Sequence, residues 1–215
     1  MQVKRLLIIT FGLLLAAAAA QETQTAGTGN GDQDLKVGDI APSWALMYAP
    51  AKFEFLKTWS VEESKRLRLF SSQPDRHAVL LSFFATWCMP CMKELPILEE
   101  VFQQYKDKRI KFFLIDITEA TRSNPGYENM PKAGPFLKKK GVTMQILYDN
   151  RGTVMKRYNA QTLPRLFLLD GNQTIRMARK GFHEGEEELF KKELSEMIDS
   201  LLAELPVAKN GRGKS

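Results

Sequence analysis

Apolar residues occur along the chain in two patterns, continuous runs that predict strands and helical spacing that predicts helices. Two of the runs, HAVLLSFF (77–84) and IKFFLIDI (110–117), are typical of strands covered on both faces of a sheet. Shorter runs predict further strands at 144–149 and 164–170. After the last of these, Asp170-Gly171 is a tight-turn signal that leads into one more strand.

Helical spacing follows Leu95, and a second helix is predicted at 131–141, with Gly141 as its stop. A third is predicted at 184–205, where acidic residues favour the helix N-terminus. The elements alternate as strand, helix, strand, helix, strand, and then give a strand hairpin and a final helix. This order predicts an α/β fold with a central mixed β-sheet flanked by helices on both faces. Residues 37–76 show no clean period, and we interpret them as an N-terminal extension with some helix at 61–70.

The two ends of the chain differ from its middle. Residues 1–20 combine a basic start, an apolar run and an Ala-x-Ala site, which is typical of a cleaved secretory signal peptide with Gln21 as the mature start. The run of about 15 residues is short for a membrane span of roughly 20, although an uncleaved anchor is the alternative. Residues 21–34 are predicted to be a flexible linker, 35–205 one folded domain, and 206–215 a disordered basic tail.

Charge adds little to this organisation. The chain has 215 residues, and 31 Lys and Arg against 25 Asp and Glu give a net charge of +6. The basic residues are mostly scattered among acidic ones, whereas a nucleic-acid-binding surface needs them clustered on one face. We therefore expect no nucleic-acid partner. An exported chain of this kind is expected in an oxidising compartment, most simply a bacterial periplasm.

The only two cysteines, Cys88 and Cys91, stand in ATWCMPCMKELP (85–96). As a structural staple they would close a loop of about four residues, worth about 1.9 kcal/mol against about 3 kcal/mol for a loop of fifteen. Structural zinc needs four ligands, and neither His77 nor His183 has motif spacing to the pair. Two thiolates would suit Cu(I).

A redox pair explains more of the local sequence. The cysteines stand where a buried strand is predicted to turn into a helix. Cys88 would lie at the helix N-terminus, where free N–H groups and the helix dipole favour its thiolate. Cys91 would lie one turn further in and be less exposed. Trp87 would shield the pair with an aromatic wall.

Residues FFATWCMPCMKELP (83–96) strongly resemble the active site of thioredoxin-fold oxidoreductases, which carry W-C-x-P-C at this junction. Pro96 matches the helix-kinking proline of that fold. The segment TLPRLFLLDGNQTI (162–175) resembles its active-site proline loop, with Pro164 as the cis-proline. The resemblance therefore implies a thioredoxin-like fold.

More narrowly, the chain resembles the TlpA/ResA-like periplasmic thiol-disulfide oxidoreductases. Residues 36–44 are similar to the opening segment of that branch, and 148–164 to its inserted αβ unit. Glu94 matches a glutamate typical of the branch, and Ser82 stands where cytosolic thioredoxins place a buried aspartate. The chain departs from the branch at Asn159-Ala160 and Arg165, on either side of the proline loop. These positions are expected to border the partner groove, so the resemblance leaves the partner undefined.

The resemblance implies an enzyme in which Cys88 attacks a substrate disulfide and Cys91 resolves the mixed disulfide. Glu94 also falls on the apolar stripe of the predicted helix with Leu98 and Val101, so we expect it to be a buried proton acceptor for Cys91. The substrate is expected to dock on the backbone of Leu163 and on Pro164 as an added strand. Trp87, Met89 and Pro90 are expected to line the same contact surface.

The expected partners are protein disulfides, with apocytochrome c as a candidate client, and a membrane electron-donor protein. No cofactor beyond the redox-active disulfide is expected, since the chain has no G-x-G-x-x-G fingerprint. Met89-Pro90 between the cysteines contains no histidine, which favours a reductant over an oxidant. The alternative is a copper or haem-assembly metallochaperone of the same fold that uses both thiols as ligands. A peroxidase is disfavoured because no P-x-x-x-T-x-x-C motif occurs.

Overall fold

The structure, a computed structural model, describes residues 34–68 and 75–206. The predicted signal peptide and nearly all of the predicted linker and tail lie outside these residues. The strands are β1 (Ala45–Ala49), β2 (Lys52–Phe55), β3 (Ala78–Phe84), β4 (Ile110–Asp116), β5 (Gln145–Tyr148), β6 (Arg165–Leu169) and β7 (Ile175–Lys180). The helices are α1 (Met89–Tyr105), α2 (Thr118–Thr121), α3 (Ala133–Lys139), α4 (Thr153–Arg157) and α5 (Glu187–Glu204), with a 3-10 turn at Leu56–Thr58.

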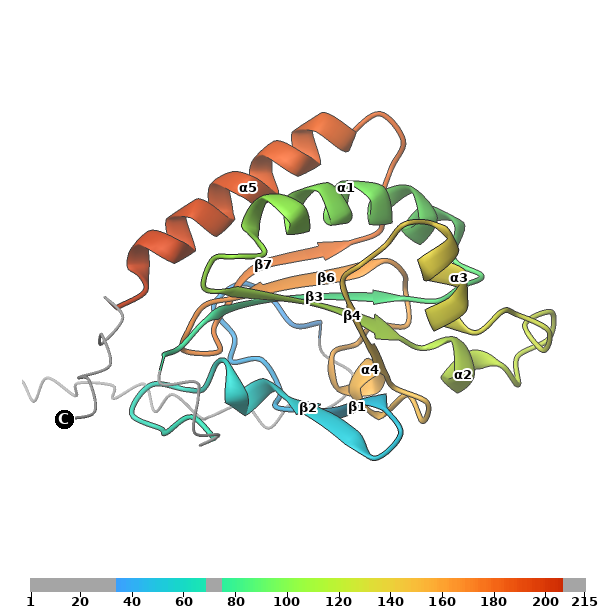
Figure 1. Cartoon of the computed structure of the whole chain (residues 1–215), viewed down its shortest axis with the longest axis horizontal. Helices are drawn as coiled ribbons and strands as arrows, with labels where there is room; N and C mark the ends of the chain where they lie inside the picture. The colour runs from blue at the N-terminus through green and yellow to red at the C-terminus, as the bar shows by residue number, and fades with distance from the viewer. Residues whose placement is uncertain (1–33, 69–74, 207–215) are drawn as a thin grey trace, which may run out of the picture.

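The strands form one mixed sheet in the order β2-β1-β5-β4-β3-β6-β7 (Figure 1). At its centre β3 pairs with β4 in parallel and with β6 in antiparallel register. Helices α1 and α5 lie side by side over one face, and α4 lies on the other (Figure 1). The predicted α/β architecture with helices on both faces is therefore confirmed.

Each face of β3 supports a different layer. On the α4 side, Phe83 packs with Tyr158 and Phe167, with ring centroids 5.3 to 6.2 Å apart. On the α1 side, Ser82 meets Glu94. All seven residues of β3 are buried, as expected of a central strand whose side chains alternate between two covered faces.

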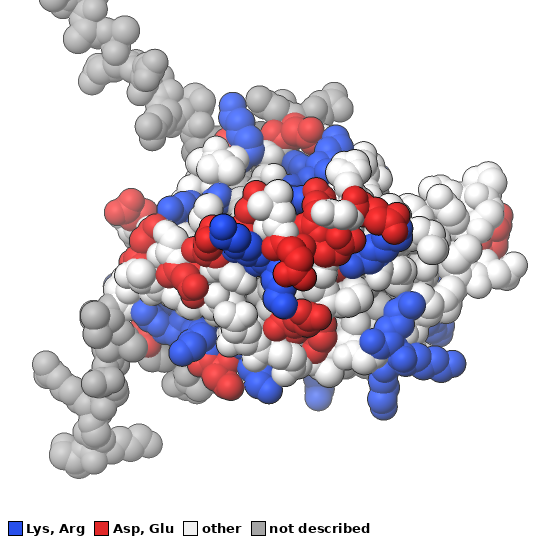
Figure 2. All heavy atoms as spheres, turned by 90° about the horizontal axis from the view of Figure 1, so that it is seen from above, with Lys and Arg blue, Asp and Glu red and all other residues white. Residues whose placement is uncertain are grey.

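The outer surface of the α1–α5 layer carries charges of both signs (Figure 2). Lys191 of α5 binds Glu100 of α1 at 2.5 Å, and Arg176 of β7 binds Glu204 near the end of α5 at 2.6 Å. Exposed pairs of this kind contribute little to stability. Helix α5 is held on the sheet mainly by burial of its apolar stripe, which includes the fully buried Phe190.

The helix predicted at 61–70 is wrong over its described part, since residues 61–68 form turns and irregular chain. The guanidinium of Arg76 donates hydrogen bonds to the carbonyl oxygens of Val61, Glu62 and Lys65, the last at 2.6 Å. These carbonyl oxygens therefore accept hydrogen bonds from the Arg76 side chain, and not from the backbone N–H groups of a helix. Regular structure lies earlier in the extension, where β1 and β2 form a hairpin at the sheet edge.

The predicted hairpin after β6 is confirmed, and Gly171 serves it by leaving space, since a Cβ there would meet Leu205 Cδ2 at 2.9 Å. Asp170 N–H bonds Thr174 O at 3.0 Å, and Gln173 takes the left-handed conformation with φ 68°. The Asp170 carboxylate accepts the N–H groups of Asn172 and Thr174 and so fixes the loop. Gln173 is buried, and its side chain bonds the carbonyl oxygen of Ala41, which ties the turn to the N-terminal extension.

The β1–β2 turn offers a test of backbone strain. Ala51 follows Pro50 with φ 58°, a conformation that glycine adopts freely. Ala51→Gly is expected to raise the free energy of unfolding by about 0.5–1 kcal/mol, the strain relieved less the entropy that glycine adds to the unfolded chain. Urea unfolding measures this change. Ala49→Gly, in the neighbouring strand, is the control and should lower stability; an Ala51→Gly variant that is also less stable would contradict the prediction.

Candidate active site

The cysteine pair lies at the junction between β3 and α1. Cys88 is the N-cap residue of α1, and its sulfur accepts the N–H of Cys91 at 3.2 Å. The two cysteines form a disulfide with their Cα atoms 5.3 Å apart. Cys88 is 3% exposed and Cys91 is fully buried, so the structure has the predicted order of depth. An N-cap sulfur is close to the positive end of the helix dipole, which favours a thiolate there.

The turn that carries Cys88 is fixed by hydrogen bonds from neighbouring segments. Thr86 N–H donates to the hydroxyl oxygen of Thr118 at 3.0 Å, and the Thr86 hydroxyl donates to the carbonyl oxygen of Pro131 at 3.0 Å. The Cys88 N–H donates a hydrogen bond to Ala85 O at 3.0 Å. The approach to the disulfide is therefore held by residues that follow β4, far along the chain.

Trp87 forms one wall of the site. Its ring stacks on Tyr127 with centroids 4.3 Å apart and planes at 3°, and its indole N–H donates to Thr121 Oγ1 at 2.9 Å. The segment that carries Tyr127 is held by Arg122, whose guanidinium donates to the carbonyl oxygens of Glu128 and Met130. The sequence alone does not predict a role for Tyr127; its one signal is a lone aromatic residue in the polar segment 122–131.

The other predicted contact residues differ in exposure. Met89 is 70% exposed and Pro90 is exposed, whereas Leu163 is half-buried and Pro164 is buried. The Leu163–Pro164 peptide bond is cis, as the resemblance implied. Because Phe83 pairs with Arg165, the start of β6 lies beside the end of β3. The proline loop and the cysteine turn therefore meet at one end of the sheet.

Glu94 lies on the inner side of α1, one turn beyond Cys91. It is 1% exposed and accepts a hydrogen bond from Ser82 Oγ at 3.1 Å. Burial raises the pKa of Glu94 to about 7, against the lowering effect of the Ser82 hydrogen bond. The expected burial of this carboxyl group is confirmed.

Arg165, one of the positions that depart from the branch, is turned away from the partner side. It is 5% exposed, donates to the carbonyl oxygen of Leu35 at 3.1 Å, and lies 3.8 Å from the Asp34 carboxylate. Register places it on the Phe83 face of the sheet, opposite to α1. The expectation that this side chain borders the partner groove is not met, because it holds the start of the N-terminal extension instead.

The histidines considered as metal ligands lie apart from one another in the fold. His77 packs on Trp59, and its Nδ1 lies 2.9 Å from Asp75 O. His183 follows β7, where its N–H donates to Glu186. Within residues 34–68 and 75–206, no group of three or more His, Cys, Asp or Glu side chains is arranged to hold a metal ion.

A mixed sheet, a cysteine pair at a strand-to-helix junction and a cis-proline loop at the same sheet end define a thioredoxin-like protein with a disulfide at its candidate active site. More particularly, the chain belongs to the AhpC/TSA family, whose family model matches residues 37–178. The thiol-disulfide oxidoreductase ResA of Bacillus cereus is 26% identical over 194 residues, covering 89% of this chain and 98% of the relative. The sporulation thiol-disulfide oxidoreductase A of Bacillus subtilis is 28% identical over 102 residues, covering 47% and 58%.

A solved structure supports the same fold. The crystal structure of a thiol:disulfide interchange protein of the thioredoxin family from Chlorobium tepidum has a TM-score of 0.51 and 18% identity, and covers 79% of this chain and 99% of that one. Together the comparisons make this chain a thiol-disulfide oxidoreductase of the type of ResA and of the sporulation thiol-disulfide oxidoreductase A. In the part of the chain that the structure describes, no helix is long and apolar enough to span a membrane.

Proposed function

We propose that the protein is an exported reductase of protein disulfides, with Cys88 as the attacking thiol and Cys91 as the resolving thiol. The observation that carries this assignment is the position of Cys88 at the N-cap of α1, where the Cys91 N–H already donates to its sulfur. In the reduced protein the same donor and the helix dipole would stabilise the Cys88 thiolate. The full burial of Cys91 supports its assignment as the thiol that acts second.

The electron balance follows from thiol-disulfide exchange. The Cys88 thiolate attacks one sulfur of the client disulfide, forms a Cys88–client bond and releases the first client thiolate. The Cys91 thiolate then attacks Cys88 Sγ, which breaks the mixed disulfide and releases the second client thiolate. Two electrons pass from the protein's dithiol to the client, whose thiolates take up two protons as pH requires. A second dithiol must then reduce the Cys88–Cys91 disulfide.

We assign Glu94 the removal of the Cys91 proton. Its pKa of about 7 lies where a general base is half ionised near neutral pH. Its position one helical turn from Cys91, in the same buried layer, supports the assignment. Ser82 would keep the carboxyl group oriented through its hydrogen bond.

The client would lie across the proline loop. Backbone groups of Leu163 would pair with an extended client segment in the manner of an added strand, and Pro164 would shape the contact. Trp87, Met89 and Pro90 would cover the client cysteine from the other side. Met89 is the most exposed large apolar side chain in the described residues, which suits a contact residue.

We propose a periplasmic location, a membrane electron-donor protein that returns the disulfide to the dithiol, and apocytochrome c as a client. The signal-peptide pattern of residues 1–20 supports export. The TlpA/ResA-like resemblance supports the donor and the client. No resident cofactor is proposed, because the Cys88–Cys91 pair itself carries the two electrons when it is reduced to a dithiol.

The reductase direction is tested by the redox potential. Equilibration with glutathione buffers is expected to give a value below about −200 mV, nearer to thioredoxin at about −270 mV than to DsbA at about −120 mV. The reason is that Met89-Pro90 adds no positive charge to stabilise the reduced thiolate. Met89→His is the matched variant and should raise the potential. A wild-type value close to that of DsbA would mean that the protein is an oxidant.

A further inference from the structure

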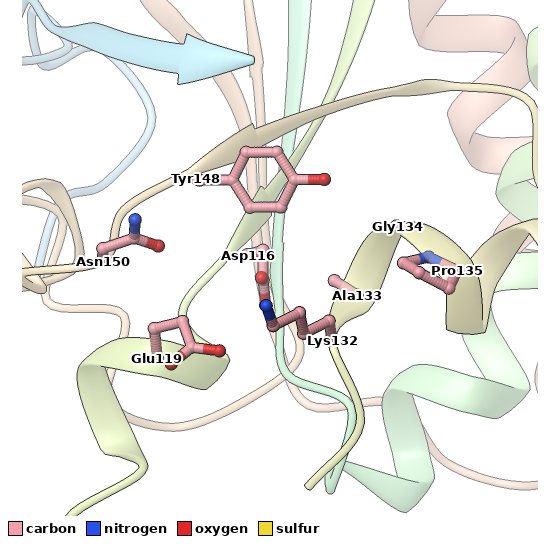
Figure 3. Close-up of a pocket in the computed structure, with 8 residues that line it drawn as sticks. All are labelled: Asp116, Glu119, Lys132, Ala133, Gly134, Pro135, Tyr148 and Asn150. Carbon is pink, nitrogen blue, oxygen red and sulfur yellow. The ribbon is translucent and has the colours of Figure 1, made fainter. Parts of the chain in front are cut away.

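A pocket of about 570 Å³ opens at the carboxyl ends of β4 and β5 (Figure 3). Its lining includes Asp116, Glu119, Lys132, Gly134, Tyr148 and Asn150. Its volume falls within the range of small-ligand sites, and the carboxyl edge of parallel strands is where α/β sheets place such sites. The pocket takes no part in the chemistry assigned to the cysteines.

The pocket is joined to the redox site by a short hydrogen-bond chain. Asp116 Oδ1 accepts both the hydroxyl and the N–H of Thr118, at 2.5 and 2.9 Å. The same Thr118 hydroxyl accepts the Thr86 N–H at 3.0 Å. The Asp116 carboxylate of the pocket is therefore two hydrogen bonds away from the turn that carries Cys88.

Asp116 is the chemically unusual residue of the pocket. Its side chain is 2% exposed, and it points into the hollow from the end of β4 (Figure 3). Thr118 satisfies only Oδ1; among the described residues Oδ2 has no hydrogen-bond partner. Burial raises the pKa of this carboxyl group. A buried carboxylate with an open oxygen gains most from a cationic donor that enters the pocket.

In the described part of the chain, the other charged side chains that line the pocket do not pair with Asp116. Glu119 is already neutralised, because the Arg122 guanidinium donates to both of its oxygens at 2.8 and 2.6 Å. Lys132 is exposed and reaches over the pocket from the N-cap of α3 (Figure 3), yet within the described residues it forms no ion pair with Asp116 or Glu119. An incoming cation would have to displace only this exposed side chain.

The shape of the pocket favours a flat cation. The Tyr148 ring forms one wall above Asp116 (Figure 3). A Cβ at Gly134 would meet the Tyr148 hydroxyl at 3.0 Å, so the glycine gives the Tyr148 ring room to lie along this side of the pocket. A guanidinium can stack on an aromatic ring while it donates in its plane to a carboxylate, which an ammonium group cannot do as well.

We propose that this pocket is a specificity subsite that binds an arginine side chain of the client polypeptide while the client disulfide meets Cys88. The identity of the client as a disulfide-bearing polypeptide rests on the proposed function. Binding of a guanidinium at Asp116 does not, and can be measured without any redox step.

The direct test is an NMR titration of the oxidised full chain with N-acetyl-arginine amide, and with its neutral isostere N-acetyl-citrulline amide. Saturating shifts of the Tyr148 and Asn150 backbone amides are expected with arginine only. Asp116→Asn keeps an oxygen for Thr118 and should weaken binding about tenfold, as loss of a charged hydrogen bond does. Glu196→Gln, an exposed acid on α5, is the charge-matched control and should bind normally. Lys132→Met should bind more tightly.

Equal responses to arginine and citrulline, no response to either, or unchanged binding by Asp116→Asn would overturn the subsite. A second arm compares disulfide peptides that carry arginine or citrulline at each of the positions flanking the cysteine. One position is expected to show about a tenfold rate preference for arginine that Asp116→Asn removes. Exchange with uncharged hydroxyethyl disulfide should be alike in both proteins. If that exchange is absent in the wild type, the proposed function fails while the titration still decides the subsite.

Discussion

Cys91→Ala is expected to accumulate client proteins disulfide-linked to Cys88, whereas Cys88→Ala is expected to capture none. Without the resolving thiol, the mixed disulfide formed by Cys88 can be released only by an external thiol. Turnover of either variant should fall by at least about a thousandfold, because the two thiols act as one unit. Non-reducing gels and mass spectrometry of the trapped species measure both outcomes. The N-terminal peptide of the trapped protein, expected to begin near Gln21, reports export in the same experiment.

The assignment of Cys88 as the attacking thiol and Cys91 as the resolving thiol can be checked by an independent measurement. In the reduced single-cysteine variants, iodoacetamide should alkylate Cys88 faster than Cys91 near neutral pH, because only Cys88 is at the N-cap of α1. The double variant Cys88→Ala/Cys91→Ala gives the background. Trapping through Cys91 in the Cys88→Ala protein, together with faster alkylation of Cys91, would reverse the two roles.

Glu94→Gln is expected to change both the pH dependence of stability and the rate of exchange. The pKa of Glu94 is raised in the folded protein to about 7 by burial, so the folded state disfavours its ionisation. A group with a raised folded pKa contributes its full stability below the unfolded value, about 4.3 for Glu, and loses it as pH rises toward 7. At pH 8 the loss amounts to about 4 kcal/mol. Glutamine cannot ionise, so this loss should disappear, and stability near neutral pH should be unchanged or higher.

Denaturant unfolding of the oxidised proteins from pH 5 to pH 8 measures this difference. In the exchange assay, the wild-type rate should rise with pH through about 7, as Glu94 becomes able to accept the Cys91 proton. The glutamine variant should be slower, with a flatter profile. Ser82→Ala is the matched control: it removes the hydrogen bond that lowers the Glu94 pKa and should move the profile to higher pH. A glutamine variant that is less stable at neutral pH yet exchanges normally would make Glu94 a structural residue.

The local sequence determined the chemical centre. Continuous apolar runs identify β3 and β4, because a strand covered on both faces must be apolar at successive positions. Cys88 is placed at a helix start by its position between such a strand and a helical pattern. The burial of Glu94 follows from its place on the apolar stripe of α1. Each of these features depends on residues that are close in sequence, so the spacing of apolar residues along the chain indicates it directly.

Tertiary structure decided what surrounds that centre. Tyr127 reaches Trp87 across 40 positions of chain. The register of β6 places Arg165 on the far face of the sheet, where it meets Leu35 and Asp34. Residues 61–68 are held by Arg76 out of the helix that their composition suggested. The Asp116 pocket exists only because α2, α3 and the ends of β4 and β5 converge. Contacts between residues this far apart in the sequence are set by the packing of whole helices and strands. Hydrophobic periodicity carries no information on which distant side chains will meet.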